Sequence, residues 1–135
     1  MITDSKDLAE YILRNYRNKV VEVGVGSRPE VALLLKNSIE VVVTDIKEQE
    51  FVGIRFYIDD IFHPDINIYK NASLIYSIRP PIELQEAMAR VASSIGADLI
   101  IRPFGNQIAD LSRYFRKCIL LNYKKARFYL YQKYH

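Results

Sequence analysis

Glycines and carboxylates recur in this chain where short apolar runs end. Gly24 and Gly26 follow the apolar run that contains Glu22, and Asp45 ends a second run nineteen residues after Gly26. Glycine lets the chain turn tightly and lets a ligand approach the backbone where no Cβ stands in the way. The carboxylate of Asp45 has two oxygens that can accept hydrogen bonds from both hydroxyls of a ribose. These residues predict a site for an adenosine-containing small molecule.

A third carboxylate position follows the next apolar run, 54–58, where the chain reads Asp59-Asp60. A carboxylate there can accept a hydrogen bond from the amino group of an adenine, and we assign this role to Asp60. The alternative is that one of the two aspartates caps the turn that follows. Plain alternatives also exist for the earlier residues: the glycines can serve a strand-to-helix turn, and Asp45 can be an ordinary loop residue.

Four candidates for a substrate pocket follow the apolar runs 72–76 and 98–101. They are Ser77, Arg79, Pro80 and Arg102. Two guanidinium groups at strand ends can form a cationic pocket for an anionic substrate, because arginine binds carboxylates and phosphates bidentately. Separate salt bridges for the two arginines, and a rigidifying role for the prolines, are the alternatives. No catalytic residue is assigned, since Asp60 and Tyr76 are candidates for a base only by their location.

The elements that hold these residues alternate between apolar strands and helical spacings, which predicts an α/β sandwich with three layers and a mostly parallel sheet. The expected strands are 20–23, 39–44, 54–58, 72–76 and 98–101, followed by an antiparallel hairpin at the sheet edge from 117–121 and 127–131. The carboxyl ends of parallel strands meet at one edge of a sheet, so the candidate residues are expected to converge there. Only residues 46–53 link the second and third strands, so the second crossover helix is expected to be short or absent.

Three helices have clear sequence signals. Asp4 is a candidate N-cap for the first, and Ser27 and Glu30 have the spacing of a capping box for a helix over 29–36. This second helix is expected to direct Val31, Leu33, Leu34 and Leu35 toward the sheet. The third helix spans 82–95, where apolar residues recur at helical spacing before Gly96. A short additional helix is expected through Ile108 and Leu111. The single cysteine, Cys118, is expected to be a buried strand residue.

Length and composition fit one soluble α/β domain over residues 1–135. The net charge is +3, half of the residues are hydrophobic, and no segment has the pattern of a membrane span or a signal peptide. We therefore expect a cytoplasmic protein. The two histidines, His63 and His135, have no second histidine or cysteine at ligand spacing, so no metal site is expected.

The C-terminal segment 111–135 is basic, with seven Lys or Arg residues and no Asp or Glu. Such a face can bind a nucleic acid. The alternative is that these side chains solvate the outer face of the terminal hairpin. A homodimer is also left open by the sequence.

The segment Glu22-Val23-Gly24-Val25-Gly26 resembles the first motif of class I S-adenosylmethionine-dependent methyltransferases, E/D-x-G-x-G-x-G. Arg28 stands where that motif has its third glycine, and it can instead pair with the carboxylate of the cofactor. The strings VVEVGVG, VVTDIK, DDI and LIYSIRPP together resemble a more specific group, the archaeal uncharacterised protein family number 0146. This likeness covers roughly residues 8–131 and implies a small Rossmann-like, methyltransferase-like domain.

The resemblance implies a cofactor and a set of residues that bind it. The cofactor is S-adenosylmethionine; Glu22, Gly24 and Gly26 would line its methionine and ribose side, Asp45 would bind the ribose, and Asp60 the adenine region. The implied function is a methyltransferase of unknown acceptor. Many amino-methyltransferases carry an Asn/Asp-Pro-Pro-aromatic loop at this position. Here Ser77 replaces the amide or acid and no aromatic residue follows, so the resemblance does not imply methylation of a nucleic-acid base. The alternatives are a non-catalytic cofactor-sensing or partner-binding module and, third, a dinucleotide dehydrogenase.

Overall fold

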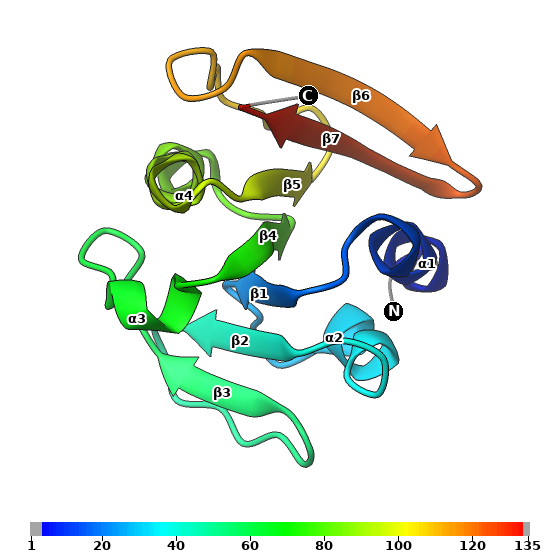
Figure 1. Ribbon diagram of the computed structural model, residues 1–135, viewed down its shortest axis with the longest axis vertical. Coiled ribbons are helices and arrows are strands. Elements are labelled where there is room, and N and C mark those ends of the chain that lie inside the picture. Colours follow the sequence, from blue (N-terminus) through cyan, green and yellow to red (C-terminus); the bar gives the residue numbers. More distant parts are fainter. Residues whose placement is uncertain (1–3, 134–135) are drawn as a thin grey trace.

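The computed structural model describes residues 4–133 and arranges them in three layers. A central sheet separates helices α1 (Ser5–Asn15) and α2 (Glu30–Leu35) from helices α3 (Ile66–Tyr69) and α4 (Ile82–Ile95), as Figure 1 shows. Within residues 4–133, no helix combines the length and the apolar character needed to cross a bilayer. His135, one of the two histidines weighed as metal ligands, lies outside the described residues.

The sheet has seven strands in the order β3-β2-β1-β4-β5-β7-β6. Their bounds are β1 Lys19–Val23, β2 Val41–Asp45, β3 Arg55–Ile58, β4 Ala72–Ile78, β5 Asp98–Arg102, β6 Lys117–Tyr123 and β7 Ala126–Gln132. The first five strands are parallel, and β7 pairs antiparallel with both β5 and β6. The strand order changes direction between β1 and β4, which is the point where ligands bind in open α/β sheets. The predicted Rossmann-like sheet with a terminal hairpin is confirmed.

The connection between β2 and β3 contains no helix, which confirms the expectation drawn from its length. The two strands are nevertheless parallel, with Asp45 opposite Ile58 at their carboxyl ends. Aromatic packing takes the place of the missing helix: the rings of Phe51, in the loop, and Phe56, on β3, meet edge-on with centroids 6.0 Å apart. A loop alone therefore carries the chain from β2 back to the amino end of β3.

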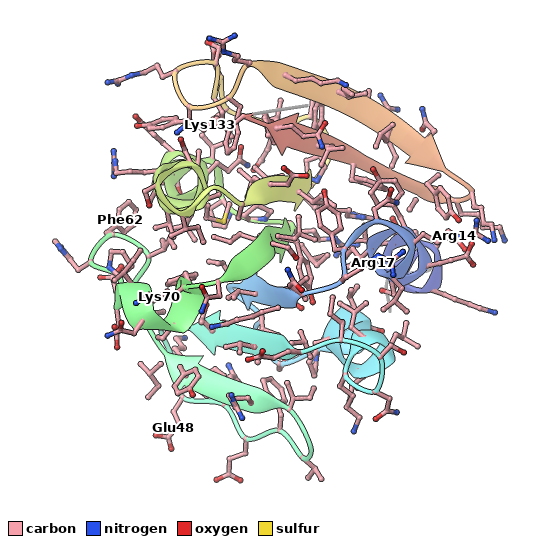
Figure 2. All side chains as sticks on the ribbon, in the orientation of Figure 1. Arg14, Arg17, Glu48, Phe62, Lys70 and Lys133 are labelled. Carbon is pink, nitrogen blue, oxygen red and sulfur yellow. The ribbon has the colours of Figure 1, made fainter. Side chains whose placement is uncertain are left out.

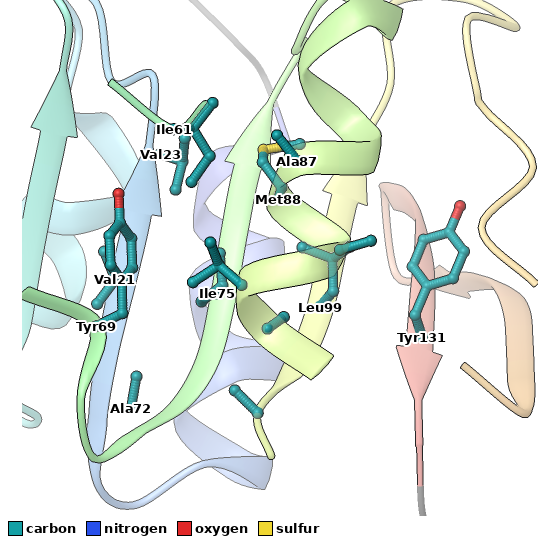
Figure 3. Close-up of a cluster of buried hydrophobic side chains, with 14 of the residues drawn as sticks. Val21, Val23, Ile61, Tyr69, Ala72, Ile75, Ala87, Met88, Leu99 and Tyr131 are labelled. Carbon is teal, nitrogen blue, oxygen red and sulfur yellow. The ribbon is translucent and has the colours of Figure 1, made fainter. Parts of the chain in front are cut away.

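The core on the side of α3 and α4 is built from alternate residues of the central strands. Val21, Ile75 and Leu99 lie on the face of β1, β4 and β5 that α3 and α4 cover, in one cluster with the fully buried Met88 of α4, as Figure 3 shows. Strand side chains alternate between faces and helical side chains recur every three to four residues, so the two patterns match across this interface. The strand ends that form the site are thus fixed on a rigid base.

On the opposite side, α1 packs against both α2 and the terminal hairpin. Leu8 and Ile12 are buried in the same cluster as Phe128, and the rings of Tyr11 and Phe128 meet edge-on at 5.0 Å. Polar contacts lie at the rim of this interface, where the Tyr123 hydroxyl donates to Glu10 at 2.5 Å. Helix α1 therefore joins the start of the chain to its last two strands.

Three expectations about helix ends and helix faces were wrong. Helix α2 begins at Glu30 with Pro29 as its N-cap and has no side-chain cap, so the predicted capping box does not form. Leu33 and Leu34 are exposed rather than packed on the sheet. Asp4 does precede α1, but its side chain makes no cap, because its carboxylate pairs with Arg102 on β5. A long-range ion pair has replaced the local hydrogen bond.

Two expectations about the C-terminal part were also wrong. The segment 103–116 forms turns rather than a short helix, although Leu111 in it is buried with Phe115. Apolar spacing over such a short stretch does not distinguish a helix from a packed loop. Cys118 is exposed, because β6 is the outermost strand of the sheet.

Candidate functional site

A cavity of about 160 Å³ lies at the carboxyl ends of β1, β2 and β3. We call it the Asp45 cavity; its lining consists of Val23, Gly24, Thr44, Asp45, Ile46, Asp59, Asp60, Ile61, Phe62 and Leu84. Three residues singled out from the sequence, Gly24, Asp45 and Asp60, therefore share one cavity. Parallel pairing is the reason, because it brings the carboxyl ends of β1, β2 and β3 to the same edge.

Asp45 ties the glycine turn to β2. Its Oδ2 accepts a hydrogen bond from the backbone N–H of Gly26 at 2.7 Å, and its Oδ1 accepts one from Lys47 at 3.1 Å. Each carboxylate oxygen can accept a second hydrogen bond, so Asp45 keeps acceptor capacity toward the cavity. Its carboxylate is held in place by the backbone before any ligand arrives.

The turn that Asp45 holds is made possible by its glycines. Gly24 and Gly26 have φ angles of +68° and +64°, a conformation that costs an ordinary residue roughly 1–2 kcal/mol. A Cβ built on either residue would have no atom within 4 Å, so open space lies beside this backbone. A ligand can therefore approach the turn closely.

Asp59 and Asp60 both have internal partners. Asp60 Oδ1 accepts from the N–H of Phe62 at 2.9 Å, so Asp60 caps the turn after β3 while it lines the cavity. Asp59 accepts from the N–H of Asp65 at 2.9 Å and from the Tyr69 hydroxyl at 2.7 Å. Burial, with Asp59 contributing, raises the pKa of Tyr69 above its usual range. Both aspartates thus shape the loop, which is the alternative the sequence left open.

Two apolar side chains flank the Asp45 cavity. Ile46, directly after Asp45, is 66% exposed, and Phe62 is 50% exposed on the loop between β3 and α3, where Figure 2 labels it. Exposed side chains of this size at a cavity mouth offer flat apolar surface to a ligand. The sequence signal that could have identified them is an apolar residue shortly after a carboxylate at a strand end.

A second cavity, of about 120 Å³, lies beside Glu22 between the ends of β1 and β4 and the starts of α1 and α2. We call it the Glu22 cavity; its lining consists of Ser5, Glu22, Val25, Arg28, Glu30, Val31, Ile78 and Arg79. Oε1 of Glu22, Oε1 of Glu30 and the Ser5 hydroxyl are buried there, and none has a hydrogen-bond partner within residues 4–133. Buried polar atoms are normally paired, so this cluster points to a ligand.

Glu22 itself is only 2% exposed on β1, opposite Tyr76 on β4. Burial raises its pKa to about 8, and the neighbouring Tyr76 hydroxyl offsets part of that effect. Burial likewise raises the pKa of Tyr76, with the Glu22 carboxyl adding to the shift. Burial therefore favours the protonated form of Glu22, and a cation placed in the cavity would favour loss of that proton.

The four substrate-pocket candidates do not share one cavity. Ser77 is buried, and its hydroxyl donates to the carbonyl of Val23 at 2.7 Å, which joins β4 to β1. Pro80 is also buried. Arg79 lines the Glu22 cavity, whereas Arg102 lines a separate cavity at the end of β5.

The two arginines also have different partners. Arg102 Nε donates to Asp4 Oδ2 at 2.9 Å, and the Arg79 guanidinium lies 5.9 Å from the centroid of the Phe104 ring. The separate-partner alternative is therefore the observed one for Arg102. Only their backbones meet, where the N–H of Arg79 donates to the Arg102 carbonyl at 2.7 Å.

Gln85 on α4 was missed by sequence reasoning, although it organises the loops after β4 and β5. Its side chain is fully buried and donates to the carbonyls of Pro80 at 3.3 Å and Gln107 at 2.9 Å. Its Oε1 accepts from the N–H of Ala109 at 2.8 Å. A polar residue on the apolar face of an amphipathic helix was the available signal.

Comparison with solved structures shows which fold this is. A TehB-like S-adenosylmethionine-dependent methyltransferase from Corynebacterium glutamicum matches with a TM-score of 0.65 and 14% identity, over 96% of this chain and 88% of that one. The antibiotic-resistance methyltransferase Kmr gives a TM-score of 0.61 and 14% identity, over 95% and 92%. The S-adenosylmethionine-bound methyltransferase CalS10 from Micromonospora echinaspora gives 0.57 and 14%, over 90% and 58%.

Comparison with other sequences shows the family. The model of the uncharacterised protein family UPF0146 matches residues 5–133. A UPF0146 protein of Archaeoglobus fulgidus is 45% identical over 125 residues, which are 91% of each chain, and one of Methanocaldococcus jannaschii is 35% identical over 137 residues, covering 95% and 96%. The chain therefore belongs to the UPF0146 family and has the Rossmann-like fold of the class I S-adenosylmethionine-dependent methyltransferases.

Proposed function

We propose that this protein binds S-adenosylmethionine across the Asp45 and Glu22 cavities and transfers its methyl group to an acceptor. One observation carries the proposal: among the described residues, three buried oxygens, on Ser5, Glu22 and Glu30, have no hydrogen-bond partner, and they lie beside a glycine turn with open space at its backbone. The two carboxylate oxygens can accept hydrogen bonds, and the ammonium group of a methionine moiety can donate them. The fold shared with methyltransferases supports the same ligand.

The Asp45 cavity suits the adenosine part of this cofactor. Asp45 would accept hydrogen bonds from the ribose hydroxyls with the acceptor capacity that its two backbone contacts leave. Ile46 and Phe62 would cover the adenine ring, and Asp60 would lie at its polar edge. Gly24 keeps the backbone low enough for the ribose to pass over it.

The Glu22 cavity suits the methionine part. Glu22 and Glu30 would accept hydrogen bonds from the ammonium group, and Arg28 and Arg79 would bind the carboxylate. Bound there, the cofactor supplies an electrophilic methyl group. The protein's own contribution would be to hold the acceptor in line with that carbon and to exclude water, and such positioning lowers a barrier substantially.

A non-catalytic sensing module is the second candidate. It is favoured by Ser77, whose hydroxyl is engaged with Val23 and is therefore withdrawn from any acceptor. Such a module would bind the cofactor through the same residues and release no product. Binding and turnover must therefore be measured separately.

Calorimetric titration tests the binding part of the proposal. Wild-type protein is titrated with S-adenosylmethionine and S-adenosylhomocysteine, with NAD as the control ligand. We expect binding of the first two, its loss in Asp45→Ala, and its retention in Asp110→Ala. Asp110 is a matched control because it also accepts a backbone hydrogen bond, from Ser112 at 3.0 Å, but lies in the loop before β6. Absence of binding at millimolar ligand would overturn the proposal.

An acceptor screen then separates the two candidates. Release of S-adenosylhomocysteine that depends on an added acceptor would establish methyl transfer. Cofactor binding without release across the screen would favour the sensing module. Preferential binding of NAD would instead support a dehydrogenase.

A further inference from the structure

A third cavity, of about 320 Å³, lies where the end of β5 meets the terminal hairpin. We call it the basic cavity; its lining consists of Asp4, Arg102, Pro103, Gly105, Asn106, Leu120, Lys125, Arg127 and Tyr129. Arg102 and Asn106 come from β5 and the loop after it, while Lys125 and Arg127 come from the hairpin turn and β7. Basic side chains from separate segments thus converge on one concavity.

The charges around this cavity are unbalanced. Among the described residues that line it, Asp4 is the only acid, and Asp4 is paired with Arg102. Within residues 4–133, no carboxylate pairs with the side chain of Lys125 or Arg127. Two cations without counter-charges at a concave surface attract an anion.

Two other basic residues of the same segment are neutralised. Lys124 pairs with Glu10 at 2.6 Å, and Arg113 pairs with Glu86 at 3.6 Å. Arg116 and Lys117 are exposed at the far end of the hairpin, away from the basic cavity. Lys125 and Arg127 share a concave surface with Arg102, which favours a small anion there over a polyanion.

A buried acceptor adds a second requirement for the ligand. Asp4 Oδ1 is buried and has no hydrogen-bond partner among residues 4–133, whereas Oδ2 accepts from Arg102. A ligand that completes this site would bring a donor, such as a hydroxyl or amino group, as well as an anionic group. Leu120 and Tyr129 provide an apolar wall for the rest of the molecule.

The basic cavity adjoins the Glu22 cavity. Asp4 lines one and the next residue, Ser5, lines the other. Arg79 of the Glu22 cavity is joined to Arg102 of the basic cavity by the 2.7 Å backbone hydrogen bond. A molecule held in the basic cavity would therefore lie next to the proposed methionine end of the cofactor.

We infer that the basic cavity binds the anionic group, a phosphate or a carboxylate, of a small methyl acceptor. The acceptor is of metabolite size and carries the amine or alcohol group that receives the methyl group. The acceptor role rests on the proposed function. Lys125, Arg127 and the Asn106 amide would bind the anion, and Asp4 would bind the donor group. In the transfer, the acceptor nitrogen or oxygen forms a bond to the methyl carbon while the carbon–sulfur bond breaks with its electrons on sulfur. The acceptor's proton passes to water.

Nuclear magnetic resonance titration of the full chain tests the anion site without any cofactor. The probes are inorganic phosphate, acetate and a uridine oligonucleotide. We expect saturable shifts at the amides of Asn106, Lys125 and Arg127 with phosphate or acetate. The affinity should fall at least about tenfold in Arg127→Gln and stay unchanged in Lys117→Gln, an exposed basic residue at the far end of the hairpin.

Two results of this titration would overturn the inference. One is equal phosphate affinity in Arg127→Gln and wild type. The other is tighter binding of the oligonucleotide, with steep salt dependence and shifts that spread to Lys117. The comparison of phosphate with acetate identifies which anionic group the cavity prefers.

A second measurement separates this inference from the proposed function. Calorimetry of Arg127→Gln with S-adenosylmethionine should give wild-type affinity, because Arg127 lies outside both cofactor cavities. Cofactor binding without phosphate binding would overturn only the anion site. Phosphate binding without cofactor binding would overturn the acceptor role. With both present, turnover of an anionic acceptor should exceed that of its neutral analogue at least about tenfold, and Arg127→Gln should remove that preference.

Discussion

The two ends of the carboxyl edge of the sheet differ in how their charged side chains are held. At the ends of β2 and β3, the carboxylates of Asp45, Asp59 and Asp60 all accept backbone hydrogen bonds. At the end of β5, Lys125 and Arg127 line the basic cavity, and within residues 4–133 no carboxylate pairs with either side chain. The acidic end is held by backbone hydrogen bonds, and the basic end is not. Under the proposed function, the acidic end would hold the cofactor and the basic end would hold the acceptor.

The largest expected change in stability comes from Glu22, because it is a buried acid between the two ends. Its folded pKa is about 8, against 4.5 for an exposed glutamate. Between these values the folded state holds a proton that the unfolded state has lost, so stability falls as pH rises. The free energy of unfolding should fall by up to about 5 kcal/mol between pH 4.5 and 8. Urea unfolding across this range measures it.

The control for this experiment is Glu22→Gln, which keeps the shape of the side chain without a titrating group. Its stability should lack the fall seen in wild type over the same range. A parallel pH dependence in the two proteins would show that Glu22 is already ionised in the folded state. The edge of the sheet would then carry one more negative charge, on Glu22, than we infer.

Gln85→Leu should give the next largest effect, because it detaches the loop after β4 from the loop after β5. Three hydrogen bonds are lost, and the N–H of Ala109 is left without its partner. We expect the free energy of unfolding to fall by about 3 kcal/mol in a urea titration. Gln107→Leu is the control, since that side chain is exposed, and it should change stability by less than about 0.5 kcal/mol.

Asp45→Ala tests whether the acidic end binds the cofactor. Removing the carboxylate frees the Gly26 N–H and removes the proposed ribose acceptor. We expect affinity for S-adenosylhomocysteine to fall about a hundredfold, which corresponds to roughly 2.7 kcal/mol. Phosphate affinity at the basic cavity should not change. Equal loss at both sites would mean that the two ends are not independent.

Two glycine substitutions give the smallest effects and compare the two ends directly. Gly24 and Gly105 have positive φ angles, +68° and +59°, and open space where a Cβ would stand. Alanine at either position should therefore cost about 1 kcal/mol of stability. Only Gly24→Ala should weaken cofactor binding, and only Gly105→Ala should weaken phosphate binding. If both substitutions weakened binding of the same ligand, the two ends would not be separate binding sites.

Much of the fold could be predicted because its signals are local. The apolar runs located β1 and β5 to within one residue, and helical spacing with Gly96 located α4 at 82–95. What failed depends on distant residues. The capping box did not form because α2 starts one residue later and Glu30 enters the Glu22 cavity. Cys118 is exposed because β6 is an edge strand, and strand order is not written in any short segment.

The candidate site shows the same division. Gly24, Asp45 and Asp60 were expected to converge because parallel strands end together, and they line one cavity. Arg79 and Arg102 line separate cavities, and Arg102 pairs with Asp4, ninety-eight residues away in the chain. The burial of the Glu30 oxygen likewise depends on how α2 packs beside β1, and the spacing of residues in the sequence does not predict that packing.

The contact between α1 and the terminal hairpin has a consequence for synthesis. During synthesis α1 emerges before its partners β6 and β7, and the outer edge of β5 also waits for β7. Until Ala126–Gln132 is available, the side of α1 that packs on the hairpin and the outer edge of β5 stay in contact with solvent. The nascent chain is thus prone to self-association until β7 has emerged. The complete sheet forms only when β7 is free to pair with β5 and β6.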